Sequence, residues 1–168
     1  MKNFKIKAVF LDRDGVMNED RGYINSKSDF KWLKGTKKAI KFLKKNNYLV
    51  IVITNQSGVG KGLIKVSQLK LLHRWMNKEL LKQGGWVDDF IYCPYHPDAK
   101  IKKYKKKSYF RKPNPGMILK AINKYSISTK DSFMIGDKST DKLAAKRAGV
   151  KFFYRESDLY FQLKKIIY

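Results

Sequence analysis

The sequence predicts an α/β fold, a doubly wound three-layer α/β/α sandwich around a mainly parallel sheet. Two observations lead to this prediction. Short runs rich in β-branched and aromatic residues alternate with longer amphipathic runs, and polar residues follow the apolar runs. The length of 168 residues matches the usual size of one domain, so we expect a single domain over residues 1–168.

Five short apolar runs are the expected strands. The run from Tyr48 to Ile53 is apolar throughout, as in a parallel strand whose two faces are both covered. The expected strands are Lys7–Leu11, Tyr48–Ile53, Val87–Tyr92, Ser132–Ile135 and Val150–Tyr154.

Amphipathic segments alternate with these strands. In the first of them, Ala39, Ile40 and Leu43 share one side, while lysines cover the rest. The expected helices are Thr36–Asn46, Val66–Lys82, Gly116–Tyr125, Thr140–Ala148 and Asp158–Ile167. Between the third strand and the next helix, Lys100–Lys112 contains eight basic residues and no acidic one, which predicts an exposed loop.

The composition limits the class of protein. With 43% apolar and 14% aromatic residues, the chain can bury a core, which excludes a disordered protein. Lys and Arg number 38 against 14 Asp and Glu, for a net charge of +24. Such a charge favours contact with phosphates, nucleic acid or anionic lipid, unless it reflects a compositional bias of the genome.

The cysteine content and the lengths of the apolar runs indicate a compartment. Cys93 is the single cysteine, which excludes an internal disulfide and fits a reducing environment. The N-terminal apolar run is too short for a signal peptide, and no apolar stretch approaches the ~20 residues of a membrane-spanning helix. We therefore expect a cytoplasmic protein.

Two carboxylates, Asp12 and Asp14, follow the first expected strand. Carboxylates this close together at the end of a buried strand are unfavourable without a cation. Their spacing suits a nucleophile or metal ligand beside an acid/base partner, and Gly15 permits a sharp turn after them. An Asp-rich turn is the alternative interpretation of this motif alone.

The next two motifs offer donors for phosphate. Thr54-Asn55-Gln56-Ser57-Gly58 follows the second strand and supplies neutral donors, although these residue types also make ordinary turns. Arg111 and Lys112, held between the basic loop and the pair Pro113 and Pro115, supply cations suited to phosphate. Taken alone, the pair Arg111 and Lys112 fits equally well a second interpretation, two further surface cations of the basic loop.

Acidic residues also follow the fourth expected strand, in the run Gly136–Asp141. Carboxylates such as that of Asp137 suit Mg²⁺. A helix N-terminus with Asp141 in its first turn is the alternative, and it explains one acid but not both. All four motifs stand at carboxyl ends of expected strands, where doubly wound sheets bind their ligands.

The four motifs resemble those of the haloacid dehalogenase (HAD) superfamily of aspartate-nucleophile phosphohydrolases. The finer pattern is similar to the subgroup of D-glycero-D-manno-heptose 1,7-bisphosphate phosphatases and histidinol-phosphate phosphatases. The matching runs are Phe10–Gly15, Asp20–Tyr23, Thr54–Gly58, Cys93–Pro94 with His96–Pro97, Arg111–Pro113 with Pro115–Met117, and Gly136–Lys138 with Asp141. The resemblance implies a HAD-like Rossmannoid domain, and no insertion is long enough for a sizeable cap domain.

The resemblance also implies a role for each catalytic residue. Asp12 would attack phosphorus and form an aspartyl phosphate, while Asp14 would act as general acid and then as general base. Thr54 and Lys112 would hold the phosphate oxygens.

The implied cofactor is Mg²⁺, bound by Asp12, the backbone carbonyl of Asp14, and Asp137. Asp141 would orient Lys112 or the metal shell rather than bind the metal directly. The residues implied in substrate binding are Asp20, Arg21, Gly22, Tyr23, Asn55, Gln56, Ser57, Arg111 and Lys138.

The sequence departs from the subgroup in the loop after the third strand, where many members bind a structural zinc. Only Cys93 remains of the four ligands, with Tyr95, Ser108 and Phe110 at the other positions. One thiolate, even with His96 nearby, cannot make a four-coordinate site, so we expect no structural zinc.

The implied reaction is hydrolysis of one phosphomonoester of a small sugar bisphosphate, foremost the C7 phosphate of heptose 1,7-bisphosphate. That step would supply heptose for surface glycans such as lipopolysaccharide. Histidinol-phosphate phosphatase is one alternative, and a 3′-phosphatase of nucleic-acid ends is the alternative that the charge favours. The complete set of catalytic motifs argues against a non-catalytic binding protein. We expect a monomer without an obligate nucleic-acid or membrane partner.

Overall fold

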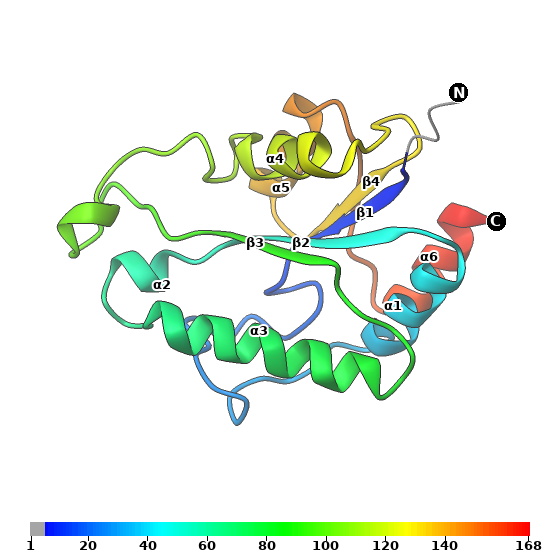
Figure 1. Ribbon diagram of the computed structural model, residues 1–168, viewed down its shortest axis with the longest axis horizontal. Helices are drawn as coiled ribbons and strands as arrows, with labels where there is room; N and C mark the ends of the chain where they lie inside the picture. Colours follow the sequence, from blue (N-terminus) through cyan, green and yellow to red (C-terminus); the bar gives the residue numbers. More distant parts are fainter. Residues whose placement is uncertain (1–5) are drawn as a thin grey trace.

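A computed structural model describes residues 6–168 and contains a five-stranded sheet (Figure 1). Its strands are β1 (Ala8–Leu11), β2 (Leu49–Asn55), β3 (Asp89–Cys93), β4 (Phe133–Gly136) and β5 (Lys151–Tyr154). They lie in the order β3-β2-β1-β4-β5, and every neighbouring pair is parallel. The expected doubly wound α/β class is confirmed, while residues 1–5 of the expected domain lie outside the described residues.

Helices cover both faces of the sheet and make three layers (Figure 1). The helices on one face are α4 (Gly116–Tyr125) and α5 (Ser139–Arg147). Those on the other face are α1 (Thr36–Lys45), α3 (Val66–Leu81) and α6 (Leu159–Ile167). Among residues 6–168, no helix combines the length and the apolar character needed to cross a bilayer.

Alternate residues of the central strands pack into the two helical layers. In β1, Val9 and Leu11 belong to the core shared with α1, α3 and α6, whereas Ala8 and Phe10 belong to the core shared with α4 and α5. All four are fully buried. A central parallel strand must be apolar on both faces, which explains the uninterrupted apolar runs of the sequence.

Several strands and helices begin or end at other residues than the sequence predicts. Thr54 and Asn55 lie inside β2 rather than after it, because pairing with the last two residues of β3 continues beyond the apolar run. The third strand begins at Asp89 instead of Val87. Two short elements were not expected: helix α2 (Ser57–Gly60) and the 3₁₀ turn η1 (Lys102–Tyr104) in the basic segment, which projects away from the sheet (Figure 1).

Ile40 is fully buried where α1 packs on the sheet. We expect Ile40→Ala to lower the free energy of unfolding by about 2–5 kcal/mol, because the surrounding core cannot collapse fully into the cavity. Lys38→Ala, at an exposed position of the same helix, is the matched control and should stay within about 0.5 kcal/mol of the wild type. Urea denaturation followed by circular dichroism measures both; equal losses would contradict the packing of α1.

Candidate active site

The carboxyl ends of β1, β2 and β4 meet at one edge of the sheet, around a pocket of about 400 Å³. Two of the sequence-predicted site residues, Arg21 and Asp137, are not part of its lining. The lining residues are Asp12, Asp14, Asp20, Gly22, Tyr23, Thr54, Asn55, Gln56, Ser57, Arg111, Lys112, Lys138 and Thr140. The fold therefore brings together residues from all four motifs.

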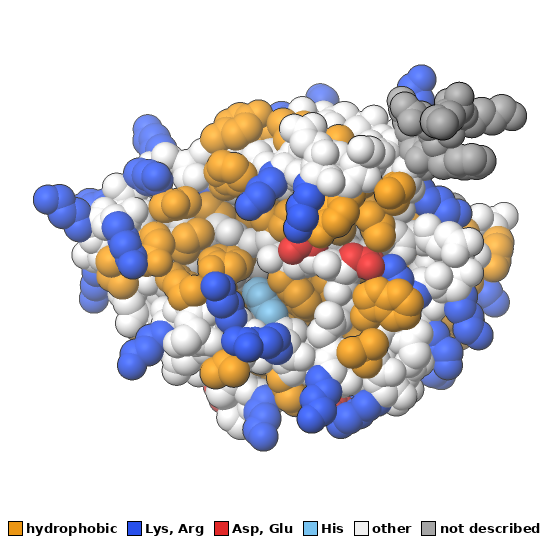
Figure 2. All heavy atoms as spheres, viewed as in Figure 1, with side chains coloured by type: hydrophobic (Ala, Val, Ile, Leu, Met, Phe, Trp, Pro, Cys, Tyr) orange, Lys and Arg blue, Asp and Glu red, His pale blue; other side chains and the backbone are white. Residues whose placement is uncertain are grey.

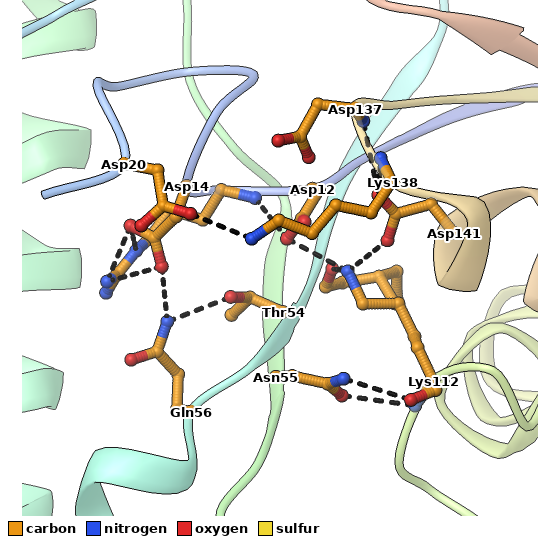
Figure 3. Close-up of polar contacts among 12 residues, drawn as sticks. Asp12, Asp14, Asp20, Thr54, Asn55, Gln56, Lys112, Asp137, Lys138 and Asp141 are labelled. Carbon is orange, nitrogen blue, oxygen red and sulfur yellow. Dashed lines mark hydrogen bonds and ion pairs between the residues drawn. The ribbon is translucent and has the colours of Figure 1, made fainter. Parts of the chain in front are cut away.

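A buried ammonium group joins two carboxylates on one side of this pocket (Figure 3). Nζ of Lys112 lies 2.9 Å from Oδ1 of Asp12 and 2.6 Å from Oδ1 of Asp141. It also donates a hydrogen bond of 2.9 Å to the backbone carbonyl of Ile53. The Lys112 residue is only 3% exposed, so these three oxygens replace its water.

The end of β2 fixes the backbone that carries this lysine. Nδ2 of Asn55 donates to the carbonyl oxygen of Lys112, and the amide nitrogen of Lys112 donates to Oδ1 of Asn55, both at 3.1 Å. This reciprocal pair of hydrogen bonds attaches the segment before α4 to the sheet, and it holds Lys112 facing Asp12.

Burial governs the electrostatics of this cluster. Burial raises the pKa of Asp12 to about 7, although the Lys112 ammonium lowers it. Burial also raises the pKa of Asp137. For Lys112, burial lowers the pKa, but Asp12 and Asp141 together raise it by a larger amount. The net shift is upward, so Lys112 keeps its positive charge. Three carboxylates around one ammonium leave excess negative charge, which a divalent cation would offset.

The carboxylate arrangement fits a hard divalent cation. Oxygens of Asp12, Asp137 and Asp141 lie within 4.8 Å of one another. Asp141 is already engaged, since Oδ1 faces Lys112 and Oδ2 accepts from the backbone N–H groups of Asp137 (3.2 Å) and Lys138 (3.0 Å). Oδ1 of Asp137, by contrast, is buried and has neither a hydrogen bond nor an ion pair within the described part of the chain. This available oxygen, next to Asp12, is the donor type that Mg²⁺ prefers.

Glycines permit the close approach of these groups. The backbone of Gly15 has φ +83°, and a Cβ there would overlap the carboxylate of Asp137. A Cβ at Gly136 would overlap the side chain of Asp141 in the same way. Both positions therefore need glycine for space, and Gly15 needs it for its left-handed conformation as well.

Asp14 lies on the other side of the pocket, in a separate hydrogen-bond network (Figure 3). Its Oδ1 accepts from Nδ2 of Asn18 and its Oδ2 accepts from Nε2 of Gln56, both at 2.9 Å. The same Gln56 nitrogen donates to Oγ1 of Thr54 at 2.9 Å. Thr54 and Asp14 are thus linked through one amide.

Sequence reasoning missed two residues behind Asp14. Arg13 is fully buried, and its guanidinium group donates to the Asp14 carboxylate at 2.9–3.0 Å. On its other side, Nη1 of Arg13 lies 3.3 Å from Nε2 of the buried His73 in α3. A basic residue between two acids at the end of a buried strand was the available signal for Arg13. No local pattern pointed to His73.

The segment around Asp20 borders the pocket and is held from two sides. Nζ of Lys138 lies 2.8 Å from Oδ2 of Asp20, and Nζ of Lys61 donates to the hydroxyl oxygen of Tyr23 at 2.8 Å. The Arg21 guanidinium instead pairs with Glu19 at 2.7 Å. The structure thus brings Asp20 and Tyr23 to the pocket and directs Arg21 to a surface ion pair.

Buried Cys93 ends β3, and the segment that follows contains a group of aromatic and basic side chains. Burial raises the pKa of the Cys93 thiol. Tyr95 contacts Tyr104 with ring centroids 5.9 Å apart, and the Lys106 ammonium lies 4.3 Å from the centre of the Tyr95 ring. Cation–aromatic contacts hold this part of the loop.

Comparisons with known proteins agree with this geometry. The HAD-hydrolase-like family model matches residues 109–157. A D-glycero-β-D-manno-heptose-1,7-bisphosphate 7-phosphatase of Photorhabdus laumondii is 45% identical over 86% of this chain and 77% of the relative. A D-glycero-α-D-manno-heptose-1,7-bisphosphate 7-phosphatase of the same organism is 39% identical over 89% of this chain and 82% of its own.

A solved structure extends the similarity to three dimensions. It is the D,D-heptose 1,7-bisphosphate phosphatase of B. bronchiseptica complexed with magnesium and phosphate. It has a TM-score of 0.82 and 31% sequence identity, covering 95% of this chain and 87% of that protein. The fold and the acidic site define a HAD-like hydrolase. Within that class, the chain belongs to the heptose 1,7-bisphosphate phosphatase family.

The lowered pKa of His73 leads to a prediction about how the stability of the fold depends on pH. Burial, and then the charge of Arg13, lower its pKa from 6.5 to about 3 in the folded state. The unfolded chain therefore binds a proton at His73 that the folded chain does not, so this contribution to stability is complete above pH 6.5 and is lost as the pH falls. Between pH 7 and pH 5 we expect the wild type to lose roughly 2 kcal/mol more than His73→Gln.

Denaturant titrations at several pH values measure this difference. Ile40→Ala is the control, because it should lower stability equally at every pH. Parallel pH profiles for the wild type and His73→Gln would contradict the neutral, buried state of His73.

Proposed function

We propose that the protein is a Mg²⁺-dependent phosphatase that removes the C7 phosphate of D-glycero-D-manno-heptose 1,7-bisphosphate, in the synthesis of heptose precursors for surface glycans. The observation that carries the chemistry is the buried Lys112 ammonium 2.9 Å from the Asp12 carboxylate at the edge of the pocket. The heptose substrate is supported by the relatives at 39–45% identity, which are named as 7-phosphatases.

Asp12 is the proposed nucleophile. One of its carboxylate oxygens attacks phosphorus, the bond from phosphorus to the C7 oxygen breaks, and an aspartyl phosphate forms. Lys112 favours the ionised form of Asp12 against the effect of burial, and its ammonium then holds the phosphoryl oxygens together with the Thr54 hydroxyl.

Asp14 is the proposed general acid and base. It gives a proton to the leaving C7 oxygen and afterwards takes one from the water that attacks the aspartyl phosphate. Asp12, the backbone carbonyl of Asp14, and Asp137 would hold Mg²⁺, which supplies positive charge that offsets the repulsion between carboxylate and phosphate dianion. The buried Oδ1 of Asp137, which has no partner among residues 6–168, supports this ligand set.

The remaining pocket residues are proposed to contact the substrate. Arg21 would have to leave its ion pair with Glu19 to join them. The proposed contacts are Asp20, Gly22, Tyr23, Asn55, Gln56, Ser57, Arg111 and Lys138.

We further propose that the enzyme works as a single-domain cytoplasmic monomer without structural zinc or an obligate nucleic-acid partner. The single, buried thiol of Cys93 supports the absence of zinc. Lys and Arg side chains are spread over the visible face of the molecule rather than gathered around the few acidic ones (Figure 2), which supports a small substrate over a long polyanion.

A phosphate-release panel with Mg²⁺ tests the substrate. The substrates compared are heptose 1,7-bisphosphate as both anomers, histidinol phosphate and a 3′-phosphorylated oligonucleotide. We expect kcat/KM for the heptose to exceed that for the other two by at least about tenfold, because pocket contacts specific to one substrate contribute on that scale. A preference for the oligonucleotide that falls steeply with added salt would overturn the proposal.

Substitutions of the two acids test the chemistry. Asp12→Asn should abolish turnover of every substrate, because an amide cannot form the acyl phosphate. Asp137→Asn should weaken Mg²⁺ binding, measured by calorimetry, by at least about tenfold. Asp29→Asn, at an exposed surface position, is the control and should match the wild type. Substantial turnover by Asp12→Asn would mean that the nucleophile is misassigned.

A further inference from the structure

We propose that Arg13 and His73 are positioning residues that orient the Asp14 carboxylate at the edge of the pocket. Arg13 acts directly on Asp14, and His73 acts through Arg13. The inference rests on the proposed role of Asp14 as general acid.

Arg13 is placed to act on Asp14 and on nothing in the pocket. Its side chain is 0% exposed and does not contribute to the pocket lining, so it cannot bind the substrate phosphate. A buried ion pair of this kind contributes little net stability compared with apolar packing. Its specific property is geometric, because the planar guanidinium fork fixes the plane of the carboxylate that it contacts.

The two oxygens of Asp14 are held unequally. Oδ1 accepts three hydrogen bonds, from Nε of Arg13 (3.0 Å), Nη2 of Arg13 (2.9 Å) and Nδ2 of Asn18 (2.9 Å). Oδ2 accepts two, from Nη2 of Arg13 (3.0 Å) and Nε2 of Gln56 (2.9 Å).

These five hydrogen bonds fix the plane of the Asp14 carboxylate. Gln56 connects it to the pocket lining, because its amide group also donates to Oγ1 of Thr54. The carboxylate is therefore held at the pocket by donors on both of its oxygens.

His73 completes the support of Arg13 from behind. Arginine has only donors, so the 3.3 Å contact requires Nε2 of His73 to accept from Nη1 of Arg13. The imidazole is itself fixed, because it stacks on Phe90 of β3 with ring centroids 4.4 Å apart and an angle of 15°. The support for Asp14 thus runs from β3 through α3 to the end of β1.

Leaving-group dependence separates this role from a merely structural one. A sugar alkoxide needs a proton in order to leave, whereas p-nitrophenolate does not, and kcat/KM reports the step in which the leaving group departs. We expect Arg13→Met to lower kcat/KM for heptose 1,7-bisphosphate by about 10²–10³-fold, the scale of general acid catalysis, and for p-nitrophenyl phosphate by less than about tenfold.

A pair of His73 variants provides an independent test if Arg13→Met folds poorly. His73→Met removes the acceptor and should shift the ratio of the two kcat/KM values in the same direction, by about tenfold, the size expected when a supporting hydrogen bond is lost. His73→Gln keeps an acceptor oxygen and should restore most of that ratio. Thermal melting confirms that the compared variants are folded.

Arg155→Met is the matched control, because Arg155 is a half-buried arginine that donates to the carbonyls of Val16 and Lys34 and does not touch Asp14. It should leave the ratio unchanged. The inference is overturned by equal losses on both substrates in Arg13→Met, by indistinguishable His73→Met and His73→Gln, or by the same ratio shift in Arg155→Met. A wild-type protein inactive on both substrates would instead overturn the proposed function, and the inference with it.

Discussion

The ion pairs of Lys112 with Asp12 and Asp141 are the interaction on which the rest of the site depends. They join the end of β1, the segment before α4 and the start of α5, which are far apart in the chain. Any one of these three charges buried without the others would be strongly unfavourable. The same contacts that bring the strands' carboxyl ends together therefore also assemble the proposed catalytic groups, and Asn55 attaches the lysine backbone to β2.

The two carboxylates of the first motif have different partners, and the difference suits different tasks. Asp12 faces an ammonium group, a point charge that tolerates the changing geometry of a phosphoryl group. Asp14 faces a guanidinium fork and two amides, which fix the plane of its carboxylate. The proposed nucleophile and the proposed acid, two residues apart, thus acquire separate electrostatic environments from separate parts of the fold.

The net charge of +24 is the most conspicuous property of the sequence, yet few of its cations lie at the pocket. Lys and Arg side chains are distributed over the visible surface (Figure 2), as expected for solvated helix faces such as that of α1. Arg111, Lys112 and Lys138 line the pocket together with Asp12, Asp14 and Asp20, and the first two of these acids are the proposed catalytic groups.

The sequence by itself determined the order of strands and helices and the four motifs, because apolar runs and strand-end residues are local patterns and a parallel sheet gathers its strand ends at one edge. Only the tertiary structure decided that Arg13 meets His73, sixty positions along the chain, and that Asn55 holds the backbone of Lys112, 57 positions along the chain. It also decided that Thr54 and Asn55 belong to the strand. These outcomes depend on side chains and backbone groups that meet only after packing, which no local spacing encodes.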